Sequence, residues 1–132
     1  MRIIVGVGCD RGTPLETLET ALDQALALAG LGREAVGGIA TIDKKHDEAC
    51  ILSLADHQKW PVHFFTAEQL AQVPVPNPSA TVLKHMGTPA VAEAAALLAA
   101  EAGLDQLLVE KHKHRGADGR NATVSIARTE DE

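Results

Sequence analysis

Aromatic residues are nearly absent from this sequence. One tryptophan, two phenylalanines and no tyrosine make up 2% of the 132 residues. Hydrophobic residues nevertheless reach 45%, which is ordinary for a globular domain. The core must therefore be built from Ala, Leu, Val and Ile, whose small side chains allow helices to pack close to a sheet. A chain of this length fits one domain with a core of its own.

Cysteine, long apolar runs and excess positive charge are also lacking. Cys9 and Cys50 do not form a disulfide framework, so we expect reduced thiols and a cytoplasmic location. Met1 leads directly into the apolar residues 3–5 without a signal-peptide layout, and no apolar run reaches the roughly 20 residues of a membrane span. The net charge of -6 argues against general nucleic-acid binding. We expect neither membrane nor nucleic acid as a partner.

Short apolar runs alternate with amphipathic helical patterns along the chain. The predicted strands cover about residues 2–8, 38–42, 62–65, 106–110 and 122–128. The predicted helices cover about residues 15–29, 47–57, a short stretch from 66, 79–87 and 88–103. This alternation is typical of the α/β class, with a mostly parallel sheet of about five strands covered on both faces. Because no helix separates the last two strands, we expect the last strand to be antiparallel.

Several local signals define the ends of these elements. Residues 13–16 and 66–69 each fit a capping box, and Pro14 fits the first helical position. The three prolines within residues 73–78 require a loop. Residues 111–121 are predicted to form a polar loop between the last two strands. We expect a single domain over residues 1–128, followed by a short acidic tail at residues 129–132.

Basic residues concentrate where the predicted strands end. Ligands of open α/β sheets bind outside the carboxyl ends of the strands. We expect that edge to carry the candidate ligand-binding residues Gly8, Cys9, Arg11, Gly12, Asp43, Lys45, Lys111 and Lys113. The cations expected there are Arg11, Lys44, Lys45, Lys111, Lys113 and Arg115. In a chain that is acidic overall, such an edge suits a polyanion.

The glycine-rich residues 6–12 allow more than one interpretation. Their pattern is G-x-G-x-x-x-G, which does not match the G-x-G-x-x-G fingerprint of dinucleotide-binding proteins. The loop could place an anion at the N-terminus of the following helix. It could equally be a tight turn that joins a strand to a helix.

Cys9 and Asp43 are the candidate catalytic residues. Cys9 precedes a predicted helix, whose N-terminus can lower the pKa of a thiol, although a small residue in a crowded turn is the favoured interpretation. Asp43 could act as an acid or base with Lys45 as an anion holder, or it could cap the next helix. The order of His46, Asp47, Glu48 and Cys50 has no recognised metal spacing. His112 and His114 alone are too few ligands, so neither a metal nor a cofactor is predicted.

Seven segments in order together resemble one protein family. They cover residues 6–12, 40–45, 64–68, 76–79, 87–96, 108–113 and 123–128. Their order and spacing are similar to the CobE family of cobalamin biosynthesis, and to the C-terminal domain of CbiG, the cobalt-precorrin hydrolase of the anaerobic pathway. The resemblance implies a three-layer α/β/α fold and a role on corrinoid intermediates. The segments also add Asn77, Ser79, Gly87 and Thr88 to the candidate ligand-binding residues, although residues 76–79 could equally be a stiff turn.

Three functional hypotheses follow from the residues and the resemblance together. Corrinoid intermediates carry carboxylates around an apolar macrocycle, and a basic edge offers them the opposite charge. The leading hypothesis is a protein that binds a precorrin or corrinoid intermediate and hands it over between enzymes. The second is a hydrolase or lyase that acts on a ring-contracted precorrin lactone, with Asp43 as base and Cys9 or water as nucleophile. The third is an interaction module for another enzyme of the cobalamin pathway.

Overall fold

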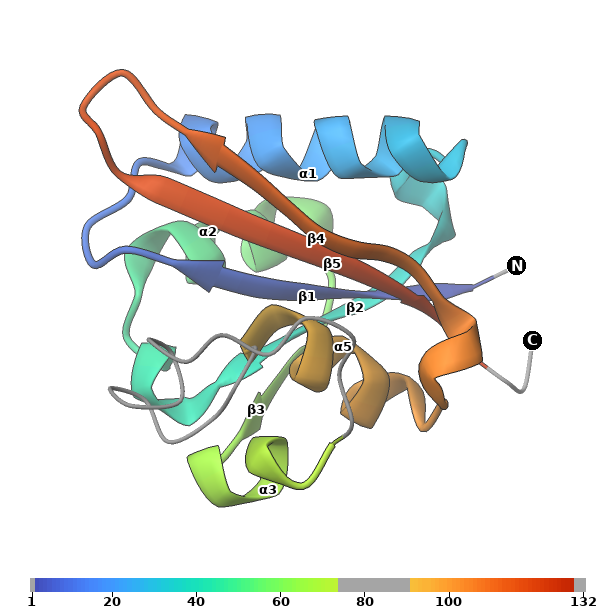
Figure 1. Ribbon diagram of the computed structural model, residues 1–132. Helices are drawn as coiled ribbons and strands as arrows, with labels where there is room; N and C mark the ends of the chain where they lie inside the picture. Colours follow the sequence, from blue (N-terminus) through green and yellow to red (C-terminus); the bar gives the residue numbers. More distant parts are fainter. Residues whose placement is uncertain (1, 74–90, 130–132) are drawn as a thin grey trace.

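The computed structural model describes residues 2–73 and 91–129, and within these residues five strands form one mixed sheet (Figure 1). The strands are β1 (Ile3–Cys9), β2 (Val36–Ile42), β3 (Val62–Phe65), β4 (Leu107–Arg115) and β5 (Asn121–Arg128). Their order across the sheet is β3-β2-β1-β5-β4. The candidate residues Asn77, Ser79, Gly87 and Thr88, and the helix predicted at residues 79–87, lie outside the described residues.

The sheet is parallel at one end and antiparallel at the other. β1 pairs in parallel with β2, and β2 with β3, whereas β5 is antiparallel to both β1 and β4. The α/β class and the antiparallel last strand are confirmed. A mostly parallel sheet is too simple a description, because β5 lies between β1 and β4 and thereby replaces a parallel ladder with two antiparallel ones. The short connection from β4 to β5 is the physical reason, since it allows only a hairpin.

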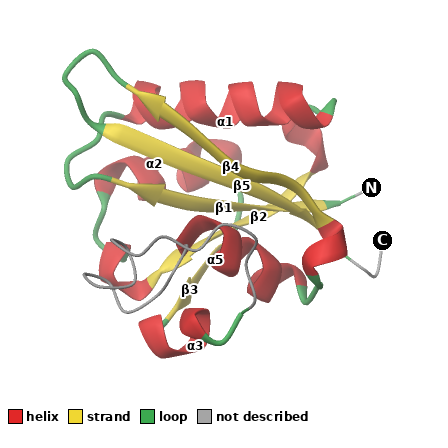
Figure 2. Cartoon of the chain, in the orientation of Figure 1, coloured by secondary structure: helices red, strands yellow, loops and turns green. Residues whose placement is uncertain are grey.

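The helices follow the predicted order closely (Figure 2). They are α1 (Leu15–Ala29), α2 (Ala49–Gln58), α3 (Ala67–Ala71) and α5 (Val91–Ala100), with short 3-10 turns at Arg33–Ala35, Asp43–Lys45 and Leu104–Gln106. The capping box at the start of α3 is confirmed, because the Thr66 side chain accepts from Gln69 N and the Gln69 side chain accepts from Thr66 N. No helix within residues 2–73 and 91–129 combines the length and apolar character needed to cross a bilayer.

Two hydrophobic clusters lie against opposite faces of the sheet. Alternate residues of β1 belong to different clusters, because successive side chains of a strand point to opposite faces. Ile3, Val5 and Val7 pack with α1 and α2, whereas Ile4 packs with α3 and α5. The face toward α5 is rich in alanine, as the shortage of aromatic residues predicts.

The alanine-rich helix α5 lies very close to β1. A Cβ atom added at Gly6 would stand 1.9 Å from the backbone oxygen of Ala92. Gly6 is itself buried in the middle of β1. The absence of a side chain at position 6 therefore sets the distance between this helix and the sheet.

The capping box predicted at residues 13–16 is wrong. α1 begins at Leu15, and Pro14 occupies the N-cap position with no side-chain cap. The Thr13 hydroxyl instead donates to the backbone oxygen of Asp10 at 2.7 Å. Thr13 closes the preceding turn, because its backbone N–H also donates to Asp10 O at 3.2 Å.

The polar loop predicted for residues 111–121 is also wrong over its first half. β4 continues to Arg115, and residues 112–115 pair with residues 121–124 of β5. Charged side chains suit this position because β4 is at the edge of the sheet, where polar residues are tolerated on both faces. Lys111 and Lys113 are therefore held on a strand.

The two ends of the described chain meet where β1 begins and β5 ends. Thr129 is buried, and both its backbone N–H and its hydroxyl donate to the backbone oxygen of Arg2. The rest of the expected acidic tail, residues 130–132, lies outside the described residues.

Candidate functional site

A cleft of about 450 Å³ opens at the carboxyl ends of β1 and β2. In Figure 1, the end of β1 lies at the left. The strand residues of the cleft are Gly8, Cys9, Ile42, Lys111, Lys113, Asn121 and Thr123. The loop residues Asp10 and Arg11, Lys45 of the 3-10 turn after β2, and the first residues of α5 complete the lining. The volume falls within the range of small-molecule sites.

The structure brings most of the predicted cationic residues together at this cleft. Arg11, Lys45, Lys111 and Lys113 all line it, as do Gly8 and Cys9. The predicted cations Lys44 and Arg115 are not part of the lining, and neither are two of the predicted ligand-binding residues. Gly12 has a φ of 82° in the turn before α1, and Asp43 is exposed at the start of the 3-10 turn after β2. Asp43 does not cap α2 either, because Glu48 occupies the N-cap position of that helix.

Alternation along β4 determines which side chains face the cleft. Lys111 and Lys113 line it, whereas His112 Nε2 is 2.7 Å from Gln24 Oε1 of α1. The two lysines thus lie on one face of the strand and His112 on the other. Bulges between Leu107 and His112 shift the register of β4 against β5, and a bulge can change which way a side chain points.

The loop after β1 is fixed to the start of β5. Asp10 Oδ2 accepts from the backbone N–H of Asn121 at 2.8 Å and from its side-chain amide at 3.2 Å. Arg120 Nε donates to the backbone oxygen of Arg11 at 3.0 Å. These bonds join two segments more than 100 residues apart in sequence and hold one wall of the cleft in place.

The positive charge of Arg11 is partly neutralised by ion pairs within the protein. Its guanidinium is 2.7 Å from Asp47 Oδ1 and 3.2 Å from Glu48 Oε1, and it donates to the backbone oxygen of Lys44 at 3.0 Å. The hydrogen bond to Asp47 raises the pKa of Arg11, and the same contact lowers the pKa of Asp47. Arg11 therefore ties the first loop to the start of α2, and the lysines are better placed to attract a ligand.

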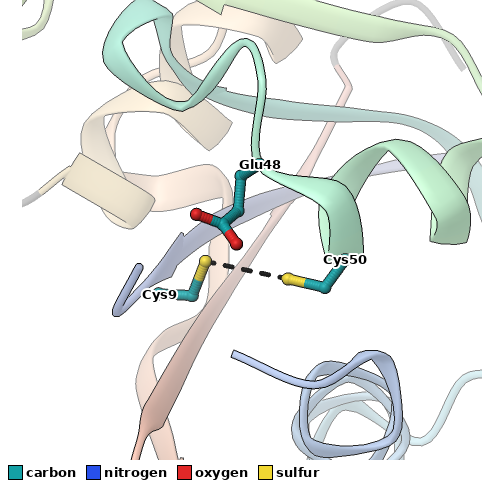
Figure 3. A group of neighbouring side chains, drawn as sticks. All are labelled: Cys9, Glu48 and Cys50. Atoms are coloured by element: carbon teal, nitrogen blue, oxygen red, sulfur yellow. Dashed lines mark hydrogen bonds between the residues drawn. The ribbon is translucent and has the colours of Figure 1, made fainter. Parts of the chain in front are cut away.

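Cys9, Glu48 and Cys50 form a compact cluster (Figure 3), and Cys9 also lines the cleft. The two sulfur atoms are 3.9 Å apart, and the two sulfurs and a Glu48 carboxylate oxygen all lie within 4.8 Å of one another. Both cysteines are free thiols. The hydrogen bond from Cys50 lowers the pKa of Cys9, and the pKa of Cys50 is raised by the same bond and by burial.

Sequence reasoning did not bring this cluster together. Forty-one positions separate the two cysteines, so no spacing motif connects them. Glu48 is only 3% exposed in a polar stretch that resembles a solvated turn. The sequence held one indication of the cluster, which is the position of its residues along the chain: Cys9 ends β1 and Cys50 lies near the start of α2, and these two ends meet at the same edge of the sheet. Glu93, Asn121 and Thr123 were missed for a related reason, since they become part of the cleft only when α5 and β5 pack beside β1.

We expect Glu48→Ala to lower the free energy of unfolding by about 1–3 kcal/mol, because the variant loses the contacts of a buried carboxylate, and a hydrogen bond to a charged group contributes more than a neutral one. Glu48 Oε2 accepts from the backbone N–H of Gly12 at 3.1 Å, and Glu48 Oε1 is 3.2 Å from the Arg11 guanidinium. The matched control is Asp47→Ala, which removes an exposed carboxylate that contacts the same Arg11. Urea unfolding should show a lower midpoint for the first variant and an unchanged midpoint for the second. Equal midpoints would contradict a positioning role for Glu48.

Comparisons with known proteins agree on one family. Residues 3–127 match the family described as "Cobalamin synthesis G C-terminus". The chain is 32% identical over 125 residues to the cobalt-precorrin-5A hydrolase of Priestia megaterium, covering 95% of this chain and 32% of that protein. It is 35% identical over 100 residues to protein CobE of a Sinorhizobium species, covering 74% of this chain and 65% of that protein. The chain thus spans about a third of the hydrolase and about two-thirds of CobE.

A solved structure agrees with these sequence matches. The crystal structure of CobE, a protein from the cobalamin (vitamin B12) biosynthetic pathway, superposes with a TM-score of 0.83 at 34% identity. The superposition covers 98% of this chain and 94% of that one. The resemblance drawn from the seven segments is confirmed: the chain belongs to the cobalamin biosynthesis family formed by CobE and the C-terminal domain of CbiG.

Proposed function

We propose that this chain binds a corrinoid or precorrin intermediate of cobalamin biosynthesis and holds it for transfer to a following enzyme. The observation that carries the proposal is the set of cations at the cleft. Arg11, Lys45, Lys111 and Lys113 line one cleft in a protein whose net charge is -6. A tetrapyrrole with carboxylate side chains offers the complementary charge.

The cleft suits one edge of such a ligand. Lys111 and Lys113 stand on a strand, and Lys45 stands across the cleft in the turn after β2. These cations can form ion pairs with the peripheral carboxylates of the ligand. The apolar lining residues Ile42, Val91 and Ala92 can contact its macrocycle. The proposal places the ligand at the edge of a three-layer α/β/α domain, an arrangement that the clusters on opposite faces of the sheet support.

Spectroscopic titration with two corrinoids tests the proposal. Cobyrinic acid keeps its peripheral carboxylates free, whereas cobinamide carries them as amides. We expect the chain to bind cobyrinic acid with one site per chain, and to bind cobinamide at least about ten-fold more weakly, a difference of about 1.4 kcal/mol. Higher salt should weaken only the cobyrinic acid complex, because salt screens exposed charges. Equal affinity for the two corrinoids, or no binding of either, would overturn the proposal.

The hydrolase or lyase hypothesis has one observation in its favour. Cys9 lines the cleft, and its pKa is lowered by the hydrogen bond from Cys50. Asp43, the base expected from the sequence, does not line the cleft, and the carboxylate close to Cys9 is that of Glu48. Incubation with a ring-contracted precorrin lactone, followed by mass analysis, tests this hypothesis. Release of a fragment by wild type and its loss in Cys9→Ser would favour it, and an unaltered lactone would contradict it.

The hypothesis of an interaction module receives less support. Among the residues that the structure describes, the exposed large hydrophobic side chains belong to four different elements: Leu28, Leu52, Phe64 and Leu108. A binding surface for another protein is expected to gather such residues in one contiguous patch. A partner among the enzymes of the pathway stays a prediction.

A further inference from the structure

We propose that Cys9, Cys50 and Glu48 form a binding site for one thiophilic divalent cation of the Zn²⁺ type, with a fourth position open to the cleft. The three side chains come from two elements that meet at the edge of the sheet (Figure 3). Cys9 is the last residue of β1, Glu48 is the N-cap residue of α2, and Cys50 lies in the first turn of α2.

The distances between the ligand atoms match tetrahedral coordination. With metal–sulfur bonds of about 2.3 Å at tetrahedral angles, two thiolates on one zinc ion are about 3.8 Å apart. The observed separation of Cys9 Sγ and Cys50 Sγ is 3.9 Å. The carboxylate oxygen of Glu48 is within 4.8 Å of both sulfurs, and small rotations can bring it to the expected distance of about 3.6 Å.

The surrounding structure holds these ligands in place. Cys50 packs in the hydrophobic cluster between α1, α2 and the sheet, and is 3% exposed. Glu48 is fixed by the backbone N–H of Gly12 and by Arg11. Contacts of this kind orient the ligands of natural metal sites and raise their affinity. The two carboxylate oxygens keep further lone pairs for a metal while they accept these contacts.

The donor set and its exposure indicate the class of cation and the character of the site. Thiolate ligands favour zinc and other thiophilic ions over Mg²⁺ and Ca²⁺, which prefer oxygen. Three protein ligands with an exchangeable fourth are typical of zinc sites that contact a substrate or water, whereas purely structural sites are closed by four. Because Cys9 lines the cleft, the fourth ligand would be water or an anionic group of a molecule bound there.

Metal titration of the untagged chain under reducing conditions tests the proposal. We expect wild type to retain one Zn²⁺ per chain after dialysis, measured by elemental analysis. Titration with Co²⁺ as a spectroscopic probe should give thiolate-to-metal charge-transfer bands and the d–d absorption of a tetrahedral ion. The charge-transfer bands identify cysteine as the ligand, and so exclude binding by the six histidines of the chain as their source.

Variants separate the cluster from its surroundings. Cys9→Ser, Cys50→Ser and Glu48→Gln should each weaken Zn²⁺ binding, the two serine variants by at least about 100-fold, since the loss of an outer-shell contact alone costs 10–100-fold. Asp47→Asn is the matched control, because it removes the neighbouring carboxylate and leaves the cluster intact; its affinity should equal that of wild type. If a serine variant does not fold, the Co²⁺ spectrum of wild type decides.

Several outcomes would overturn the site. They are a wild-type chain that keeps no Zn²⁺, a Co²⁺ complex without charge-transfer bands, or a serine variant that folds and binds Zn²⁺ as tightly as wild type. The proposal is independent of corrinoid binding, because these measurements need no corrinoid. A chain that binds Zn²⁺ but no cobyrinic acid would support the metal site and contradict the proposed function, and the reverse result would do the opposite.

Discussion

Gly6→Ala should destabilise the protein by about 3 kcal/mol or more, the upper end of the usual cost of overpacking a core. The new methyl carbon would stand 1.9 Å from the backbone oxygen of Ala92. A side chain could rotate away from such a contact, but here the neighbour is the backbone of α5, so the whole helix must move. Thermal unfolding should show a melting temperature lower by roughly 10 °C for a domain of this size.

Gly8→Ala is the matched control for this prediction. Gly8 is two residues further along the same strand, and a Cβ atom added there meets nothing within 4 Å. Its melting temperature should therefore change little, although the added methyl group narrows the cleft that Gly8 lines. If the two variants unfold at the same temperature, the close packing of α5 on β1 is not what requires glycine at position 6.

The double variant Lys111→Ala/Lys113→Ala should bind cobyrinic acid about ten-fold more weakly than wild type. A well-placed hydrogen bond to a charged group contributes roughly 1.5–3 kcal/mol, and an exposed pair contributes nearer 0–1 kcal/mol. Both lysines are exposed at the cleft, so their joint loss should cost about 1.4 kcal/mol, which is a factor of ten. The affinity of the variant should also depend less on salt. Titration at low and high ionic strength measures both effects.

Lys44→Ala/Arg115→Ala is the control for overall charge. It removes two positive charges near the same edge of the sheet, but neither residue is part of the cleft lining. A general electrostatic attraction would weaken equally in both double variants. If Lys111 and Lys113 contact the ligand directly, only their replacement should lower the affinity for cobyrinic acid. If the Lys111→Ala/Lys113→Ala variant binds cobyrinic acid as tightly as wild type at both salt concentrations, these lysines are a solvated surface and the ligand binds elsewhere.

Local patterns predicted the elements of this fold well because each pattern has a local physical cause. Leucine and alanine at spacings of three and four define the buried face of α1, and the reciprocal bonds of Thr66 and Gln69 start α3 where the sequence indicates. The end of β4 was missed because residues 111–115 have no apolar alternation. They continue β4 because residues 112–115 pair with residues 121–124 of β5.

The candidate site was predictable to the extent that strand ends meet at one edge. That rule predicts Lys45, Lys111 and Lys113 as neighbours, although they are far apart in sequence. It does not predict which side chains point inward. Asp43 and Lys45 are two residues apart in one turn, yet only Lys45 lines the cleft. The meeting of Cys9 with Glu48 and Cys50 depends on how α2 approaches β1, and this packing has no signal in either segment alone.

Mapping the bound ligand by backbone NMR tests the central claim most directly. A chain of 13.9 kDa is suited to amide spectra recorded during a titration with cobyrinic acid. Gly8, Lys111 and Thr123 line the cleft on three neighbouring strands. We predict that the amide signals of these residues shift together and that the shifts saturate at one ligand per chain. The amide signals of Leu28 and Leu52 should keep their chemical shifts. Shifts that spare the three cleft residues, or that gather around Leu28 and Leu52, would contradict a corrinoid site in this cleft.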